Sequence, residues 1–222
     1  MGAKELDEVR SNMARAAKRF DGVEREAPQL IAVSKTYGAE EILPILEAGQ
    51  RDFGENRVQE AQSKWPALRE QFPDLTLHLI GPLQTNKTKE AVSLFDVIHS
   101  LDREKLARYL KKEMEAQGKS IPLFVQVNIG EEEQKSGIAP DQTIEFVRYC
   151  QQDLGLDIQG LMAIPPVGEP PAPFFARLVE LGKDAGLAKF SMGMSADYET
   201  AIEMGASYVR VGSAIFGARD YT

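Results

Sequence analysis

The chain has 222 residues, of which 43% are hydrophobic, and a formal net charge of −8. This is typical of a globular protein with a sizeable core, and the acidic balance without any basic, aromatic-rich patch argues against a nucleic-acid partner. No apolar run approaches the ~18 residues that cross a bilayer, the charged N-terminus is unlike a secretory signal, and the single Cys150 suits a reducing compartment. We therefore expect a cytoplasmic protein that binds neither nucleic acid nor membrane.

Apolar and β-branched runs alternate with helical patterns along the whole chain. The charged amphipathic segment 4–20 predicts a helix before the first strand. Strands are expected at 30–34, 52–53, 75–80, 97–99, 122–128, 156–162, 189–192 and 208–211, and further helices at 40–48, 57–71, 86–94, 103–117, 141–153, 174–185 and 197–204. Asp102 and Asp141 are expected N-caps, Gly118 a helix stop, and the proline-rich stretch 165–173 a rigid surface loop.

Eight strands that alternate with helices predict a parallel α/β fold, either a closed barrel or an open doubly wound sheet. The count of eight favours the barrel, and so does the absence of a Gly-x-Gly-x-x-Gly fingerprint after the first strand. We expect one (β/α)8 TIM-type barrel domain over residues 1–222, with an extra N-terminal helix and its approach to the first strand in 1–24.

Polar side chains that follow the strands would share one mouth of such a barrel. Lys35 ends the first strand, Asn56 follows the second, and Arg210 lies in the eighth. An amine in such a site can attack a carbonyl to form a Schiff base. A lysine that simply emerges into water is the alternative.

Glycine and serine follow the seventh and eighth strands, where barrels often bind phosphate. Ser195 closes the first of these loops, and Gly212 and Ser213 open the second. Ordinary turn glycines are the alternative, but a lysine across from such loops indicates a phosphorylated aldehyde, most simply pyridoxal phosphate (PLP). Arg210 beside a pyridine nitrogen would keep that nitrogen unprotonated and the ring a weak electron sink. Arg210 in a helix-facing ion pair is equally compatible with the sequence.

Other candidates have less support. His78 and His99 are far apart in sequence and show no ligand spacing, so we expect no metal site. Cys150 lies in a helical pattern typical of a packed thiol, and the acidic run 131–133 is typical of a solvated loop.

Six blocks together resemble the pyridoxal phosphate homeostasis proteins (the YggS/PROSC family), over about residues 30–221. They read AVSKT at 32–36, FGENRVQE at 53–60, HLIGPLQTNK at 78–87, GLMAI at 160–164, SMGMS at 191–195 and RVGSAIFG at 210–217. The resemblance implies a barrel like that of alanine racemase, in a cytoplasmic and generally monomeric protein.

The resemblance also implies a role for each matching residue. Lys35 would form the Schiff base, Asn56 would line the cofactor ring, and Met162 would pack near it. The phosphate would be held by Ser195, Gly212 and Ser213, and Arg210 would face the pyridine nitrogen.

The implied function is to bind, buffer and hand on PLP, with apo PLP-dependent enzymes as the recipients and without an established catalytic residue. A PLP-dependent amino-acid racemase is the alternative. It needs an acid–base group on each face of the cofactor, and the alanine racemases take the second from a further C-terminal domain, which we do not expect after strand eight. A barrel-type Schiff-base aldolase fits less well, because those enzymes carry their lysine on a later strand.

Overall fold

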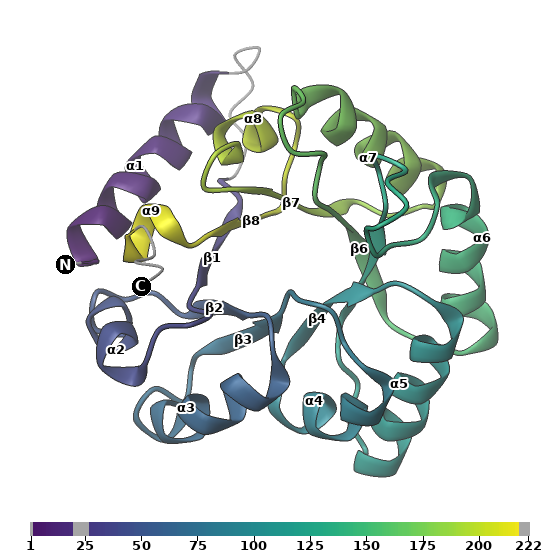
Figure 1. Cartoon of the computed structure of the whole chain (residues 1–222), viewed down its shortest axis with the longest axis horizontal. Coiled ribbons are helices and arrows are strands. Elements are labelled where there is room, and N and C mark those ends of the chain that lie inside the picture. The colour runs from purple at the N-terminus through teal and green to yellow at the C-terminus, as the bar shows by residue number, and fades with distance from the viewer. Residues whose placement is uncertain (1, 20–26, 218–222) are drawn as a thin grey trace.

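The computed structural model describes residues 2–19 and 27–217. Their strands form one closed parallel barrel in chain order, and the last strand pairs with the first (Figure 1). This confirms the predicted TIM-type barrel. The strands are β1 (Gln29–Val33), β2 (Asp52–Glu55), β3 (Thr76–Leu79), β4 (Val97–Leu101), β5 (Leu123–Val127), β6 (Ile158–Ala163), β7 (Lys189–Met194) and β8 (Tyr208–Val211).

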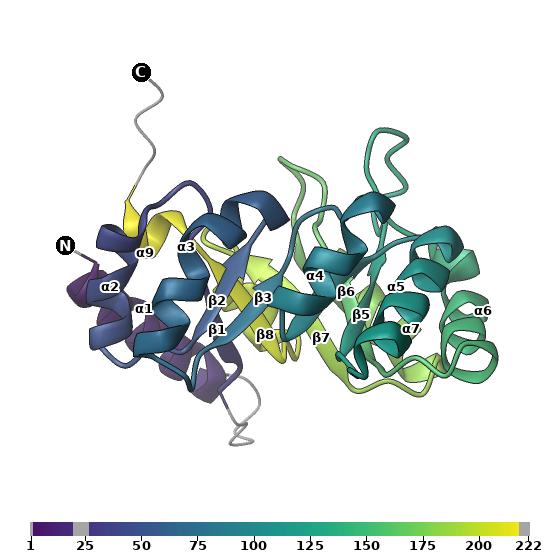
Figure 2. The same cartoon turned by 90° about the horizontal axis from the view of Figure 1, so that it is seen from below.

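Helices surround the barrel, as Figure 2 shows from the side. They are α1 (Ala3–Arg19), α2 (Ala39–Glu47), α3 (Val58–Gln71), α4 (Thr88–Leu94), α5 (Glu104–Gln117), α6 (Thr143–Arg148), α7 (Ala172–Asp184), α8 (Tyr198–Glu203) and α9 (Ser213–Phe216). Short helical turns at Thr85–Lys87, Pro140–Gln142 and Tyr149–Asp153 adjoin α4 and α6.

The extra N-terminal helix is present as α1, which packs beside α8 and α9 (Figure 1). Its apolar side chains Leu6, Val9 and Met13 recur at intervals of three and four residues and are all buried. This spacing places them on one face of a helix. The predicted end at Phe20 lies outside the described residues.

Two predicted helix caps are wrong. The N-cap of α5 is Arg103 instead of Asp102, whose carboxylate pairs with the Arg103 side chain. Asp141 lies inside the turn Pro140–Gln142, and the N-cap of α6 is Gln142. In both places the N-cap lies one residue later than the aspartate that the N-cap preference for this residue type predicts. Gly118 does end α5, in a left-handed conformation with φ +62°.

Most of the hydrophobic core lies between the barrel and its helices, while the barrel interior also holds polar and aromatic groups. His99 stacks on Phe124 with ring centroids 4.5 Å apart, and Tyr208 packs edge-on to both rings. Gly160 leaves the space that Phe124 fills, because a Cβ there would lie 2.7 Å from the Phe124 ring and 2.0 Å from the Lys189 carbonyl oxygen.

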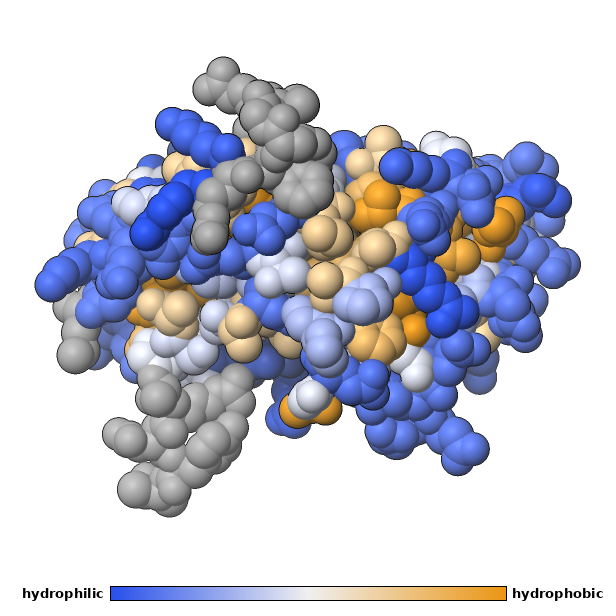
Figure 3. Space-filling model, turned by 90° about the horizontal axis from the view of Figure 1, so that it is seen from above, coloured by the Kyte–Doolittle hydropathy of each residue, from blue (hydrophilic) through white to orange (hydrophobic). Residues whose placement is uncertain are grey.

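The outer surface drawn in Figure 3 is mostly hydrophilic, with smaller apolar areas between the polar side chains. Within residues 2–19 and 27–217, no helix combines the length and the apolar composition that a bilayer span requires.

Candidate functional site

A cavity of about 320 Å³ opens where the carboxyl ends of β1, β2, β7 and β8 meet. Six of the seven predicted binding residues line it: Lys35, Asn56, Ser195, Arg210, Gly212 and Ser213. The seventh, Met162, is fully buried in β6 and is not among the lining residues. The cavity thus brings the lysine together with both glycine–serine turns.

A buried ion pair supports the loop that carries Lys35. The Lys64 Nζ of α3 donates to the carbonyl oxygens of Ser34 and Tyr37, at 2.9 Å each, so that it holds the loop on both sides of Lys35. It also pairs with Glu55 at 2.9 Å, and the side chains of Lys64 and Glu55 are 7% and 0% exposed.

The same support extends to the backbone of the loop. Thr36 adopts a positive φ of +72°, which non-glycine residues rarely do, and its N–H donates to the Glu60 carboxylate. Glu60 in turn pairs with Lys64 at 3.1 Å. The strained residue next to Lys35 is therefore held by α3.

The Glu55 side chain is fully buried and contacts Ser34, the residue before Lys35. Its Oε1 accepts from the Ser34 hydroxyl at 2.6 Å and from the Trp65 indole at 3.0 Å, while its Oε2 is buried and has no hydrogen-bond partner in the described part of the chain. Burial raises the pKa of Glu55, and the hydrogen bonds from Ser34, Lys64 and Trp65 oppose that shift.

The two glycine–serine turns are linked directly. The Gly212 N–H donates to the Ser195 hydroxyl at 3.2 Å, which leaves the Ser195 O–H able to donate to a ligand. Gly193 has a φ of +88°, and a Cβ on it would lie 2.5 Å from the Ala201 side chain. A glycine at 193 is therefore needed for β7 to turn toward Ser195 at the mouth.

Arg210 lines the cavity from β8 and is only 4% exposed. It donates to the Ser191 hydroxyl at 2.7 Å and to the Ala163 carbonyl oxygen at 3.0 Å. Burial lowers its pKa to about 10, with the Asp197 carboxylate acting in the opposite direction, so the guanidinium stays charged at neutral pH. The sequence alternative of a helix-facing ion pair is wrong.

The cavity also contains residues that sequence reasoning missed, among them Tyr37, Ile80 and Ile164. Tyr37 stacks on Phe216 with centroids 4.7 Å apart, and its hydroxyl donates to the Gly217 carbonyl oxygen at 3.1 Å. Its place two residues after Lys35, in the same loop, is the signal that could have found it.

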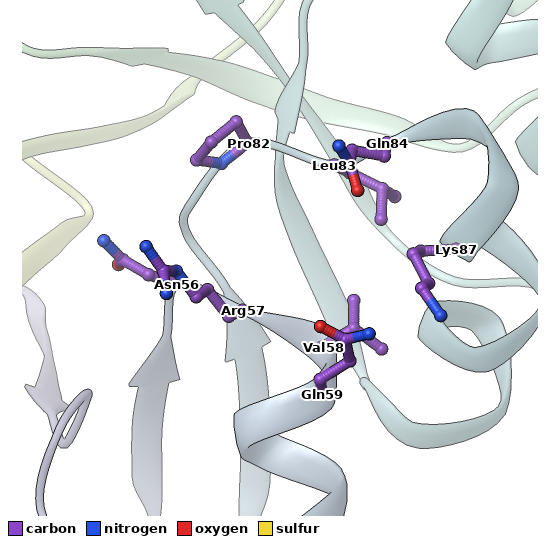
Figure 4. Close-up of a pocket in the computed structure, with 8 residues that line it drawn as sticks. All are labelled: Asn56, Arg57, Val58, Gln59, Pro82, Leu83, Gln84 and Lys87. Atoms are coloured by element: carbon purple, nitrogen blue, oxygen red, sulfur yellow. The ribbon is translucent and has the colours of Figure 1, made fainter.

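A second cavity of about 610 Å³ adjoins the first at Asn56. Figure 4 shows Asn56 and Lys87 on opposite sides of it, with the amides of Gln59 and Gln84 between them. Two of the resembling blocks, 53–60 and 78–87, supply all of its lining residues. No group of three or more His, Cys, Asp or Glu side chains suited to a metal ion occurs in residues 2–19 and 27–217.

Comparison with known proteins places this chain among two nested groups. The family model for the alanine racemase N-terminal domain matches residues 5–220. The pyridoxal phosphate homeostasis protein of Vibrio cholerae is 42% identical over 93% of this chain and 92% of its own length. The protein of the same name from Escherichia coli is 37% identical over 99% of this chain and 97% of its own length.

Solved structures agree with the sequence relatives. PipY of Synechococcus elongatus, solved without PLP, is 38% identical with a TM-score of 0.86 and covers 98% of this chain and 100% of its own. PipY with PLP bound has a TM-score of 0.83 at 37% identity, over 98% and 100% of the two chains. Alanine racemase of Clostridium difficile shares the fold at 14% identity and a TM-score of 0.75, and the match covers 98% of this chain and 57% of the enzyme. The chain therefore belongs to the pyridoxal phosphate homeostasis protein family, within the wider family of alanine racemase N-terminal domains.

Proposed function

We propose that this protein binds PLP in the 320 Å³ cavity and carries it without turning over a substrate. The observation that carries the proposal is that Lys35, Ser195, Gly212 and Ser213 line one cavity. Its volume lies at the lower end of the range for small-ligand sites, which suits one cofactor rather than a cofactor with a large substrate.

The donor set fits the aldehyde, the phosphate and the pyridine ring of PLP. The Lys35 amine can condense with the aldehyde, with loss of water, to form a Schiff base. Hydroxyls of Ser195 and Ser213 and the close approach that Gly212 allows suit the phosphate. Arg210 suits the pyridine nitrogen, and Asn56 a face or edge of the ring. When bound, PLP supplies an electrophilic carbonyl and an electron-withdrawing ring.

Two features favour a carrier over a racemase. Arg210, a donor with a permanent charge, leaves a pyridine nitrogen unprotonated and so weakens the ring as an electron sink. Among the described lining residues, the groups besides Lys35 and Arg210 that could exchange a proton are Tyr37 and two serines, and the Tyr37 hydroxyl is engaged by Gly217. A two-base inversion needs a proton-transfer group on each face of the cofactor.

Absorbance spectra of the protein mixed with PLP test the binding site. We expect a Schiff-base band that Lys35→Ala abolishes and that Lys87→Ala, a lysine of the neighbouring cavity, leaves unchanged. A band that survives Lys35→Ala would overturn the proposed attachment. Incubation with L-alanine and D-alanine then separates the functions, since inversion at enzymatic rates would contradict the carrier.

The proposal extends to the setting in which the carrier works. We infer a single-domain cytoplasmic monomer that hands PLP to apo PLP-dependent enzymes. Light scattering checks the monomer. Activation of an apo-enzyme by the loaded protein, faster than by the equivalent free PLP, checks the transfer.

A further inference from the structure

A chain of hydrogen bonds crosses the inside of the barrel from Arg210 at the mouth to Asp52 at the amino end of β2. Arg210 Nη1 lies 2.7 Å from Ser191 Oγ, which lies 2.8 Å from His99 Nδ1. His99 Nε2 lies 3.0 Å from His78 Nδ1, and His78 Nε2 lies 2.9 Å from Asp52 Oδ1. Strands β8, β7, β4, β3 and β2 each contribute one side chain.

The chain lies in the dry interior of the protein. Ser191 and His99 are 0% exposed, His78 is 1% exposed and Arg210 is 4% exposed at the cavity, while the Asp52 side chain, at 15%, is the most exposed member of the chain. Phe124 and Tyr208 pack against the histidine rings. Water therefore cannot replace a broken link inside the barrel, and each donor needs its acceptor.

The two ends of the chain determine where its protons lie. A guanidinium can only donate and a carboxylate can only accept. With neutral histidines, Arg210 donates to Ser191 and Ser191 donates to His99 Nδ1. His99 then donates through Nε2 to His78, which donates through its own Nε2 to Asp52. Every junction has one donor and one acceptor, and no second positive charge has to be buried. Burial, with His78 and Arg210 nearby, also lowers the pKa of His99 well below 6.5, which agrees with a neutral ring.

We propose that Asp52 is a positioning residue for the cofactor: through His78, His99 and Ser191 it fixes the proton order that holds the Arg210 guanidinium in place at the far end of the barrel. The effect on the cofactor rests on the proposed function, because it requires a ligand that faces Arg210. The order of the chain itself does not depend on a ligand.

Nitrogen-15 NMR of the cofactor-free protein tests the proton order, and the chain has only two histidines to assign. We expect both rings to be neutral and protonated at Nε2. In the contrary arrangement His78 is charged and His99 is neutral and protonated at Nδ1. NMR signals of that arrangement would overturn the proposal.

Asp52→Asn tests the role of the carboxylate, because the amide keeps the size of the side chain but can donate as well as accept. We expect Nδ1-protonated signals to appear, the Schiff-base absorbance maximum to shift, and the Kd for PLP to rise about tenfold, as for a weakened hydrogen bond to a charged group. Asp74→Asn is the matched control: it removes the same charge near the start of β3 but breaks only an exposed pair with Arg51.

Wild-type tautomers and an unshifted spectrum in Asp52→Asn would show that Arg210 is held without Asp52, and would overturn the proposal. The two inferences fail in different ways. If the wild-type protein gives no PLP absorbance, the proposed function is wrong, while the NMR experiment still decides the proton order.

Discussion

Replacement of Lys64 by methionine should destabilise the protein strongly and disturb the loop that carries Lys35. The substitution keeps an apolar stem of similar length but removes the ammonium that pairs with buried Glu55 and with Glu60. It also leaves the carbonyl oxygens of Ser34 and Tyr37 without this donor. Breaking a buried pair from one side costs about 3–5 kcal/mol, because the remaining charge stays buried.

In a protein of this size, a loss of that magnitude lowers Tm by roughly 6–20 °C. Urea unfolding and calorimetry measure it directly. Lys111→Met is the matched control, since Lys111 forms an exposed pair with Glu115, and it should cost less than about 0.5 kcal/mol. The double variant Lys64→Met with Glu55→Gln should recover part of the loss, because the fully buried position 55 then carries no unpaired charge, while Glu60 is 28% exposed. A Lys64→Met variant as stable as the control would refute the argument.

Three further outcomes follow from buried groups elsewhere. Unfolded His99 binds a proton below about pH 6.5 and the folded residue does not, because burial lowers its pKa. The free energy of unfolding should therefore fall as the pH drops below 6.5, by up to about 1.4 kcal/mol per pH unit. Urea unfolding at a series of pH values measures this slope, and His99→Gln should reduce it. Burial, with Glu104 nearby, raises the pKa of Cys150 to about 12, so iodoacetamide at pH 8 should label Cys150 only in denaturant, and labelling of the native protein would contradict its packing. Gly160→Ala should lower the free energy of unfolding by about 3 kcal/mol, because the new Cβ would meet the Lys189 backbone. In the control Gly38→Ala the nearest atom to the new Cβ is Glu41 Oε2 at 3.6 Å, so this change should be tolerated. Equal stabilities of the two variants would contradict the packing described here.

Much of the site could be predicted because strand ends in a parallel barrel share one mouth. Lys35 ends the first expected strand, Asn56 follows the second and Arg210 lies near the end of the eighth, so the order of the strands alone places them at the same edge. The glycine–serine loops after β7 and β8 were predictable for the same reason. Helix ends were less so: the choice between Asp102 and Arg103 as N-cap depends on where the chain leaves β4, which runs two residues beyond the predicted strand.

Contacts between distant residues could not be predicted from the pattern. His78 and His99 are 21 positions apart, and their meeting depends on the register of β3 against β4 inside a closed barrel. Lys64 lies in a helix of mixed polarity, and a lysine there is predicted to be on the surface. In the structure it is buried, because the loop after β1 packs over it. The periodicity of a single sequence indicates which face of an element a residue occupies. It does not indicate which residue lies across the barrel from it or which loop covers it.

The central claim is that the Lys35 amine and the glycine–serine turns hold the same phosphorylated aldehyde. Borohydride reduction of the protein mixed with PLP, followed by peptide mass mapping, tests it most directly. We expect the reduced adduct on Lys35, with labelling that falls sharply when pyridoxal without its phosphate is used at the same concentration. An adduct spread over other lysines, or equal labelling by the two aldehydes, would contradict the account.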